Sequence, residues 1–179
     1  MIPALETPRL VLRPLQLDDA PRFQLLFPRW EIVRYLTSRV PWPYPPDGAL
    51  SFIRDVALPA MEKGDWWQWT LRLKSDADLI VGSISLSTGE NNNRGFWLGE
   101  AWQGQGLMTE AAHAVTDCWF NVLGKPVLRV PKAIPNTSSR RISEKQGMRV
   151  IAVEDRDYVG GRFPTEIWEL TRDEWNARA

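Results

Sequence analysis

The sequence predicts an α+β protein with a mixed, mainly antiparallel central sheet flanked by helices. Aromatic and β-branched runs follow one another between residues 66 and 98 across short polar turns, which is typical of antiparallel neighbours. Helical patterns precede and follow this block, and the longest covers residues 103–123. A chain of 179 residues with 44% hydrophobic and 25% charged residues has the composition of a globular domain. Because no repeat or linker divides the sequence, we expect one domain over residues 1–179.

The first elements are a strand and a helix. Residues 9–15, RLVLRPL, alternate leucine with polar side chains, and Pro14 ends this half-buried strand. Asp18 and Asp19 then offer an N-cap. The helix that follows has apolar side chains three and four residues apart, Phe23, Leu26 and Phe27.

Two more helices are predicted before the sheet block. One covers about residues 30–36. The other begins after Asp47 and ends at Gly64, and its apolar face consists of Leu50, Ile53, Val56 or Ala57, and Met61. Residues 40–46 between the two helices contain four prolines, which lack an amide proton, so we expect a stiff aromatic surface loop there.

The remaining elements alternate between strands and helices. Three strands are predicted at residues 66–73, 79–86 and 95–98, followed by the long helix, which ends at Gly124. A strand at 127–133 and a helix at 137–146, with Gly147 after its end, come next. Two strands at about 148–158 and 162–170 are joined through Gly160 and Gly161, and Thr171 with Glu174 resembles a capping box for a terminal helix.

The composition excludes several classes of protein. Lys plus Arg equals Asp plus Glu at 22 each, so the chain lacks the positive surplus that drives non-specific binding to nucleic acids or anionic membranes. One cysteine, Cys118, and one histidine, His113, cannot form an internal disulfide or a Cys/His zinc site, so we expect no metal. With no apolar run of signal-peptide or membrane-spanning length, we expect a cytoplasmic protein.

The segment from Trp97 to Ala111 carries the clearest functional signal. A strand ends, a glycine-containing loop follows and a helix begins. The first amides of a helix lack intrahelical partners and can hold a phosphate, while Gly104 and Gly106 allow it to approach closely. This is not a dinucleotide fingerprint, because Thr109 stands where the third glycine would be, nor a P-loop, because no Gly-Lys-Ser/Thr follows. An ordinary strand-to-helix turn with two glycines is the alternative.

The loop resembles that of a known enzyme family. Gln103-x-x-Gly106-x-Met108 is similar to the pyrophosphate loop of the GNAT acetyltransferases, and WLGEAWQGQGLMTEA closely resembles the version in their RimJ/RimL subfamily. The stretch ETPRLVLRPLQLDDAPRF and residues 136–148 and 155–175 resemble the same subfamily in order and spacing. The resemblance covers nearly the whole chain and implies a GNAT fold, in which two strands splay apart at the acetyl-CoA site.

The resemblance also implies acetyl-CoA as co-substrate and assigns the residues that would bind it. Trp97 and Leu98 match the strand whose main chain pairs with the pantetheine arm. The pyrophosphate would be wrapped by Gln103, Gly104, Gln105, Gly106, Leu107, Met108 and Thr109. Asn136 matches the residue that bonds the pantetheine, with a plain helix N-cap as its alternative role, and Ser139 lies one helical turn further along the same face.

Attack of a neutral amine on a thioester requires a base, an oxyanion donor and an acid for the thiolate. The resemblance implies that a backbone amide near Leu98 is the oxyanion donor. Many members of the family have a tyrosine acid seven residues after the motif asparagine, but Ser143 stands there, so Ser139 is the preferred acid. Glu100 is the first candidate for the base, because it follows the cofactor strand. Glu166, Asp155, or a water chain with no dedicated base are the alternatives.

Four aromatic residues lie in the segment that covers the acceptor groove in this fold, and we expect some of them to line it: Trp30, Tyr35, Trp42 and Tyr44. The preferred acceptor is the N-terminal α-amine of a protein or peptide, of the ribosomal-protein type. A small-molecule amine, such as an amino acid, a polyamine or an antibiotic, is one alternative, and a non-catalytic acyl-CoA-binding module is the other. Exposed aromatic surface is also compatible with a homodimer.

Overall fold

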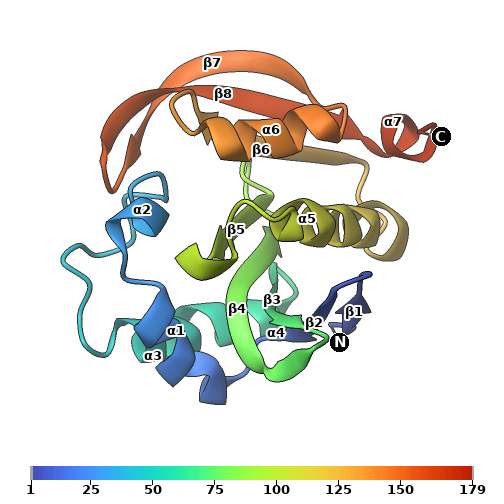
Figure 1. Ribbon diagram of the computed structural model, residues 1–179. Helices are drawn as coiled ribbons and strands as arrows, with labels where there is room; N and C mark the ends of the chain where they lie inside the picture. The colour runs from blue at the N-terminus through green and yellow to red at the C-terminus, as the bar shows by residue number, and fades with distance from the viewer. Residues whose placement is uncertain (1, 179) are drawn as a thin grey trace.

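The computed structural model describes residues 2–178 and contains two antiparallel sheets. The first has the strand order β1-β2-β3-β4-β5 and the second has the order β6-β8-β7. Figure 1 shows that α5 lies between the two sheets, with α1, α3 and α4 beside the first sheet and α6 beside the second. The predicted arrangement of a mainly antiparallel sheet flanked by helices is confirmed.

The first sheet contains the predicted strands and one more, β1. They are β1 (Leu5–Glu6), β2 (Leu10–Pro14), β3 (Trp66–Leu73), β4 (Asp76–Ser87) and β5 (Arg94–Leu98). β3 has the predicted limits, whereas β4 begins three residues early because the chain reverses within Lys74 and Ser75. The sequence analysis missed β1, because a strand of two residues has no periodicity to detect.

The helices of the first half are η1 (Leu17–Asp19), α1 (Ala20–Leu26), α2 (Trp30–Val33), α3 (Gly48–Phe52), the π-helical η2 (Ile53–Ala57) and α4 (Leu58–Lys63). Asp19 is the N-cap residue of α1, as predicted, but its side chain makes no capping hydrogen bond to that helix. The Asp19 carboxylate accepts from Arg72 of β3 and from the Gln16 amide instead. In the predicted helix after Asp47, Ala49, Ile53 and Ala57 are buried, so Ala57 rather than Val56 belongs to the apolar face. The placing of Leu50 on that face is wrong, because its side chain is exposed.

The second half begins with η3 (Glu100–Trp102), α5 (Leu107–Asp117) and the π-helical η4 (Cys118–Val122). It continues with β6 (Val127–Ala133), α6 (Thr137–Lys145), β7 (Arg149–Tyr158), β8 (Gly161–Thr171) and α7 (Arg172–Asn176). The long helix begins at Leu107 rather than Gln103, because Gly104 and Gly106 adopt left-handed conformations. The predicted capping box is present: the Thr171 hydroxyl accepts from the Glu174 amide, and the Glu174 carboxylate accepts from the Thr171 amide.

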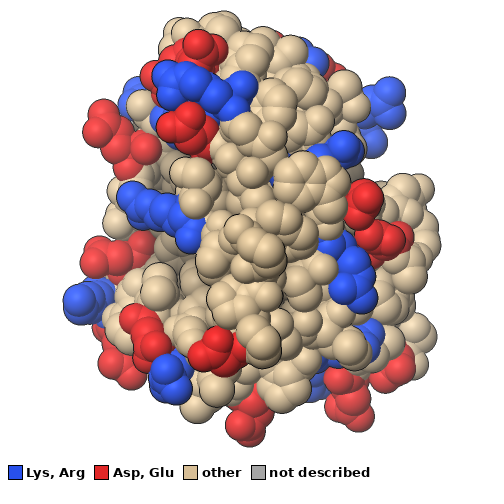
Figure 2. All heavy atoms as spheres, turned by 90° about the vertical axis from the view of Figure 1, so that its left-hand side faces the viewer, with Lys and Arg blue, Asp and Glu red and all other residues tan. Residues whose placement is uncertain are grey.

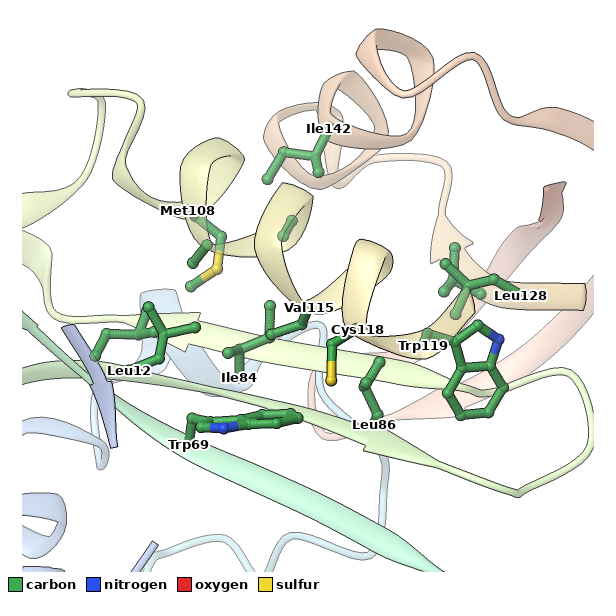
Figure 3. Packing of buried hydrophobic residues seen from close by; sticks show 14 of the residues in the cluster. Leu12, Trp69, Ile84, Leu86, Met108, Val115, Cys118, Trp119, Leu128 and Ile142 are labelled. Carbon is green, nitrogen blue, oxygen red and sulfur yellow. The ribbon is translucent and has the colours of Figure 1, made fainter. Parts of the chain in front are cut away.

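The main core lies between the first sheet and α5. Figure 3 shows Met108, Val115 and Cys118 above Leu12, Ile84 and Trp69, with Ile142 of α6 on the other side of the helix. All of these side chains are buried. Burial, with a smaller contribution from Asp117, raises the pKa of the Cys118 thiol to about 11. Cys118 is therefore an un-ionised core residue.

The two sheets meet at one end of β5 and β6 and separate along them. The Asn93 amide donates to the Arg129 carbonyl over 2.8 Å, and the Arg129 amide donates to Asn93 Oδ1 over 2.8 Å. Within residues 2–178, no further main-chain hydrogen bond joins β5 to β6. Three residues beyond this junction on each strand, Lys132 lies over the ring of Phe96, so the two strands run in the same direction. The result is a splay that opens toward Leu98 and Ala133.

Across the described part of the chain, every helix is too short or too polar to cross a lipid bilayer.

Candidate active site at the splay

The loop before α5 has the form of an anion site. Gly104 and Gly106 have φ values of +75° and +79°, which place the chain in the left-handed region that favours glycine. Gly106 is the N-cap of α5 and provides no side chain to bond the first helical amides. The amides at the start of this eleven-residue helix therefore face outward without capping partners. A Cβ at position 104 would meet nothing within 4 Å, so the approach to the loop is open.

Arg9 holds this loop from the first sheet, a contact that the sequence analysis did not foresee. The Arg9 guanidinium donates to the Gln105 carbonyl over 2.9 Å and to the Glu110 carboxylate over 2.8 Å. The Glu110 carboxylate also accepts from the Arg9 amide and the Thr7 hydroxyl. Partial burial opposes ionisation of Glu110, but these hydrogen bonds outweigh it and lower its pKa. No local pattern could reveal this clamp, because it joins residues about a hundred positions apart.

The main chain of β5 presents Leu98 to the splay. Gly82 and Leu98 are register partners, and the Gly99 amide donates to the Val81 carbonyl. Because bonded and non-bonded pairs alternate in an antiparallel ladder, the peptide groups of Leu98 and Phe96 face away from β4, toward β6. Gln103 Nε2 donates to the Leu98 carbonyl over 2.8 Å.

A Cβ at Gly82 would lie 2.5 Å from the Trp97 carbonyl oxygen, so only glycine permits this approach of β4 to β5. By the same alternation, the Trp97 peptide faces β4. Its ring packs against Phe23 and Phe27 of the N-terminal helices, with centroids 5.1 and 5.4 Å apart. Leu98 and Phe96, rather than Trp97, are thus the strand positions whose main chain faces the splay.

Asn136 and Ser139 lie at the start of α6, on the opposite wall of the splay. Asn136 is the N-cap residue, but its side chain makes no capping hydrogen bond and accepts only a long one of 3.4 Å from Ser138. The plain N-cap role is therefore not the one that its side chain plays. Ser139 is buried, and its hydroxyl accepts from Lys132 Nζ over 2.6 Å.

A buried polar cluster follows Ser139 along the inner face of α6. Ser143 stands at the position where many members of the family that the sequence resembles have a tyrosine. Its side chain is fully buried, and its hydroxyl has no hydrogen-bond partner within residues 2–178. Gln146, one turn further, accepts from Arg94 of β5 over 2.6 Å, and Arg94 also donates to Thr116 of α5 over 2.7 Å. Burial lowers the pKa of Arg94 to about 10.

The candidate bases differ in their surroundings. Glu100 is exposed at the start of η3, directly after the buried end of β5. Glu166 of β8 forms a bidentate ion pair with Arg140 of α6 at 2.8 and 3.0 Å. Asp155 is exposed on β7, at the outer strand of the second sheet. Glu100 is thus the carboxylate nearest in the chain to Leu98, and it forms no ion pair within residues 2–178.

The segment after α2 closes one side of the splay by binding the β7–β8 turn. The Val159 and Gly160 amides donate to the Leu36 and Arg34 carbonyls over 3.0 and 2.9 Å, and Thr37 forms a bridge with Tyr158. A Cβ at Gly160 would lie 2.7 Å from the Arg34 carbonyl oxygen. The segment after α2 and the β7–β8 turn, which are the two walls of the predicted acceptor side, therefore form one connected surface.

The four predicted acceptor aromatics occupy different places on this surface. Trp30 and Trp42 are 43% and 42% exposed and lie 5.9 Å apart, centroid to centroid. Tyr35 packs on Phe163 of β8 at 5.5 Å. Tyr44 packs on Phe27, and burial raises its pKa to about 12. Figure 2 shows the face that carries α2, where charged side chains lie around the margin and the middle is uncharged.

Comparison with known proteins identifies the family. The family model described as "Acetyltransferase (GNAT) domain" matches residues 9–149. No curated protein sequence matches this chain. Among solved structures, a ribosomal-protein-S5-alanine acetyltransferase from Vibrio fischeri has a TM-score of 0.81 at 16% identity, over 97% of this chain and 98% of its own.

Two further structures have similar folds. RimL, a ribosomal L7/L12 alpha-N-protein acetyltransferase in complex with coenzyme A, has a TM-score of 0.78 at 16% identity, over 97% of this chain and 98% of its own. The microcin C7 self-immunity acetyltransferase MccE, in complex with acetyl-CoA and AMP, has a TM-score of 0.75 at 17% identity, over 92% of this chain and 93% of its own.

The chain belongs to the GNAT acetyltransferase family, and it is an acetyl-CoA-dependent acyltransferase.

Proposed function

We propose that this protein acetylates the N-terminal α-amine of a protein or peptide. The observation that carries the proposal is the aromatic acceptor side, where Trp30 and Trp42 are exposed together. Residues 29–46 contain one acid, Glu31, against three arginines, so this wall does not attract a polycationic acceptor such as a polyamine or an aminoglycoside. The names of two similar structures, both ribosomal-protein acetyltransferases, point to the same class of acceptor.

The residues at the splay fit acetyl-CoA. The uncapped amides of α5 suit its pyrophosphate, with Gln103, Gly104, Gln105 and Gly106 before the helix and Leu107, Met108 and Thr109 at its start. The Leu98 main chain, which faces away from β4, and the Asn136 side chain, which makes only one long hydrogen bond, suit the pantetheine arm. When bound, acetyl-CoA supplies an acetyl thioester to the end of the splay.

Three residues have proposed roles in the transfer. The Leu98 amide donates to the oxygen of the carbonyl group as it gains negative charge. Glu100 accepts a proton from the attacking amine, either directly or through water. Ser139 gives its hydroxyl proton to the departing sulfur, so the products are an amide and a thiol. An α-amino group has a pKa of about 7.7–8.0, so roughly a tenth to a sixth of it is already neutral at pH 7, far more than for a lysine side chain.

A small-molecule amine is the second candidate acceptor. MccE, whose name refers to self-immunity against a microcin, has nearly the same fold, so the fold alone does not choose between acceptors. A third candidate, a non-catalytic acyl-CoA-binding module, is favoured by the absence of the family tyrosine at Ser143.

The test is a thiol-release assay with acetyl-CoA against four groups of acceptor: short peptides, amino acids, polyamines and aminoglycosides. Each peptide is matched by a copy whose N-terminus is already blocked, and a calorimetric titration of CoA is run beside the assay. Turnover confined to free N-termini supports the proposal. Turnover on small amines contradicts it, and CoA binding with no turnover on any amine favours the non-catalytic module.

A further inference from the structure

Two cations are buried between the sheets without a carboxylate. Lys132 and Arg94 are 5% and 3% exposed. Across residues 2–178, no acidic oxygen lies within 4.0 Å of either side chain. Glu166, the register partner of Lys132 on β8, is engaged by Arg140 of α6. A buried, unpaired cation normally costs stability, so its presence calls for another reason.

The Lys132 ammonium group is held in place by two contacts. It donates to the Ser139 hydroxyl over 2.6 Å and lies 4.4 Å from the ring centroid of Phe96. Phe96 belongs to β5, whose main chain faces the splay, and Ser139 belongs to the helix turn that begins at Asn136. Lys132 is therefore in direct contact with the hydroxyl to which the proposed function gives the role of the acid.

We propose that Lys132 is a positioning residue that supplies the proton for the departing CoA thiolate through Ser139. The inference rests on the proposed function of Ser139 as the acid. As the carbon–sulfur bond breaks, its electron pair goes to sulfur and the Ser139 proton follows. Lys132 then gives a proton to the Ser139 oxygen and becomes neutral. The proton lost by the amine enters solvent, and Lys132 takes one back from solvent, so the net reaction is amine plus thioester to amide plus thiol.

The electrostatic surroundings of Lys132 suit this role. Burial, with a further contribution from Arg94, lowers the pKa of Lys132 well below its ordinary value. An ordinary lysine holds its proton too tightly to exchange it with a thiol, whose pKa is about 8.5. Proton transfer is efficient when the two pKa values are close. The charged groups near Lys132 are Arg94 of β5, Glu166 of β8 and Arg140 of α6, and the latter two neutralise each other.

The first test uses NMR and requires no acceptor. The chain has five lysines, so [¹³C]lysine labelling gives few signals, and the Lys132 signal is the one lost in Lys132→Met. We expect CoA to shift this signal, and desulfo-CoA, which lacks the sulfur, to leave it nearly unchanged. Calorimetry verifies that both compounds bind. If both bind and affect the signal equally, the role of Lys132 is refuted while the acetyltransferase assignment stands; if neither binds, both assignments fall.

The second test separates proton supply from structure. We expect Lys132→Met to lower kcat about 100-fold and to change the KM for acetyl-CoA less than threefold. In the wild type kcat should fall as pH rises through the pKa of Lys132, and the variant should lose this fall.

Because an unpaired buried cation has been removed, Lys132→Met should unfold at an equal or higher denaturant concentration than the wild type. Lys63→Met, at an exposed lysine on α4, is the matched control and should match the wild type throughout.

Lys132→Arg distinguishes a positive charge from a proton donor. Arginine keeps the charge and the hydrogen-bond donors, but a guanidinium gives up its proton far less readily than an ammonium group in the same surroundings. We expect Lys132→Arg to remain as slow as Lys132→Met. Recovery of more than half of the wild-type kcat in Lys132→Arg, or a wild-type pH profile in Lys132→Met, would overturn the proposal.

Discussion

Arg9 and Glu110 form an ion pair of 2.8 Å that ties the turn between β1 and β2 to the first turn of α5. Arg9 also donates to the Gln105 carbonyl, so one side chain holds the cofactor loop at two points. The Glu110 carboxylate accepts from Thr7 as well. The position of the loop therefore depends on the first residues of the chain and not only on its own glycines.

Replacing Arg9 should weaken cofactor binding more than stability. An exposed ion pair contributes about 0–1 kcal/mol, so Arg9→Ala should lower the free energy of unfolding by no more than about 1 kcal/mol. A looser loop should raise the Kd for CoA roughly three- to tenfold. Calorimetric titration and denaturant unfolding measure the two effects. Arg13→Ala, at an exposed arginine on the next strand, is the control, and an unchanged Kd in Arg9→Ala would show that the loop is held without the clamp.

A bulky side chain at position 106 should abolish CoA binding. Gly106 has a φ of +79° and caps α5, so Gly106→Trp strains the backbone and covers the uncapped amides. A Cβ there lies 3.4 Å from Arg9 Nη2, which has room to move because Arg9 is half exposed. We expect a folded protein, verified by circular dichroism, with no measurable heat of CoA binding. Wild-type affinity in a folded variant would show that the pyrophosphate binds elsewhere.

Ser139→Ala should lower turnover far more than cofactor affinity. General acid catalysis contributes roughly 10²- to 10⁴-fold, so kcat should fall at least about 100-fold. The Kd for CoA should change only about threefold, corresponding to roughly 0.7 kcal/mol. Steady-state kinetics and calorimetry measure both quantities. Ser138→Ala, at an exposed neighbouring hydroxyl, is the control. Losses of equal size in kcat and affinity would make Ser139 a cofactor contact only.

Local sequence patterns predicted the helices and strands, but they did not predict the side-chain partners or where some helices begin. β3 and β6 have the predicted limits, because each is an apolar run between polar turns. The side-chain partner of Asp19 could not be predicted, because Arg72 lies 53 residues away on β3. Helix α5 begins late because the preceding glycines are left-handed, and a glycine's conformation cannot be read from its neighbours.

For the candidate site, the glycine loop and Asn136 could be proposed from the sequence because their motifs are short and contiguous. Lys132 was read only as part of a strand, because nothing in that pattern says that a charged side chain is buried between two sheets. The burial of Lys132 arises from the splay, which depends on how β5 and β6 pair at Asn93 and Arg129.

The Glu110 interactions should give stability a defined pH dependence. The pKa of Glu110 is lowered in the folded protein, so the folded state binds fewer protons at this site than the unfolded state. Its contribution is fully present above the unfolded pKa of about 4.3 and is lost as pH falls through the folded pKa. The difference in unfolding free energy between wild type and Glu110→Gln should therefore be constant above about pH 5 and shrink in more acidic solution. A difference that grows on acidification would contradict the assignment.

The contact between Gly160 and Arg34 should control the acceptor and not the cofactor. A Cβ at Gly160 would lie 2.7 Å from the Arg34 carbonyl oxygen, so Gly160→Ala must push the β7–β8 turn away from the segment after α2. The Val159 and Gly160 amides would then lose their acceptors, at a cost of about 1–2 kcal/mol. Because α5 and its loop lie apart from this contact (Figure 1), the Kd for CoA should stay within about twofold of the wild-type value. The KM for a peptide acceptor should rise about tenfold, since a change of 1.4 kcal/mol corresponds to that factor.

Gly89→Ala is the matched control, because a Cβ there meets only ordinary contacts of 3.5 Å or more. An acceptor KM that is unchanged in a folded Gly160→Ala variant would place the acceptor away from this turn, and a parallel loss of CoA affinity would show that the turn supports the whole splay instead.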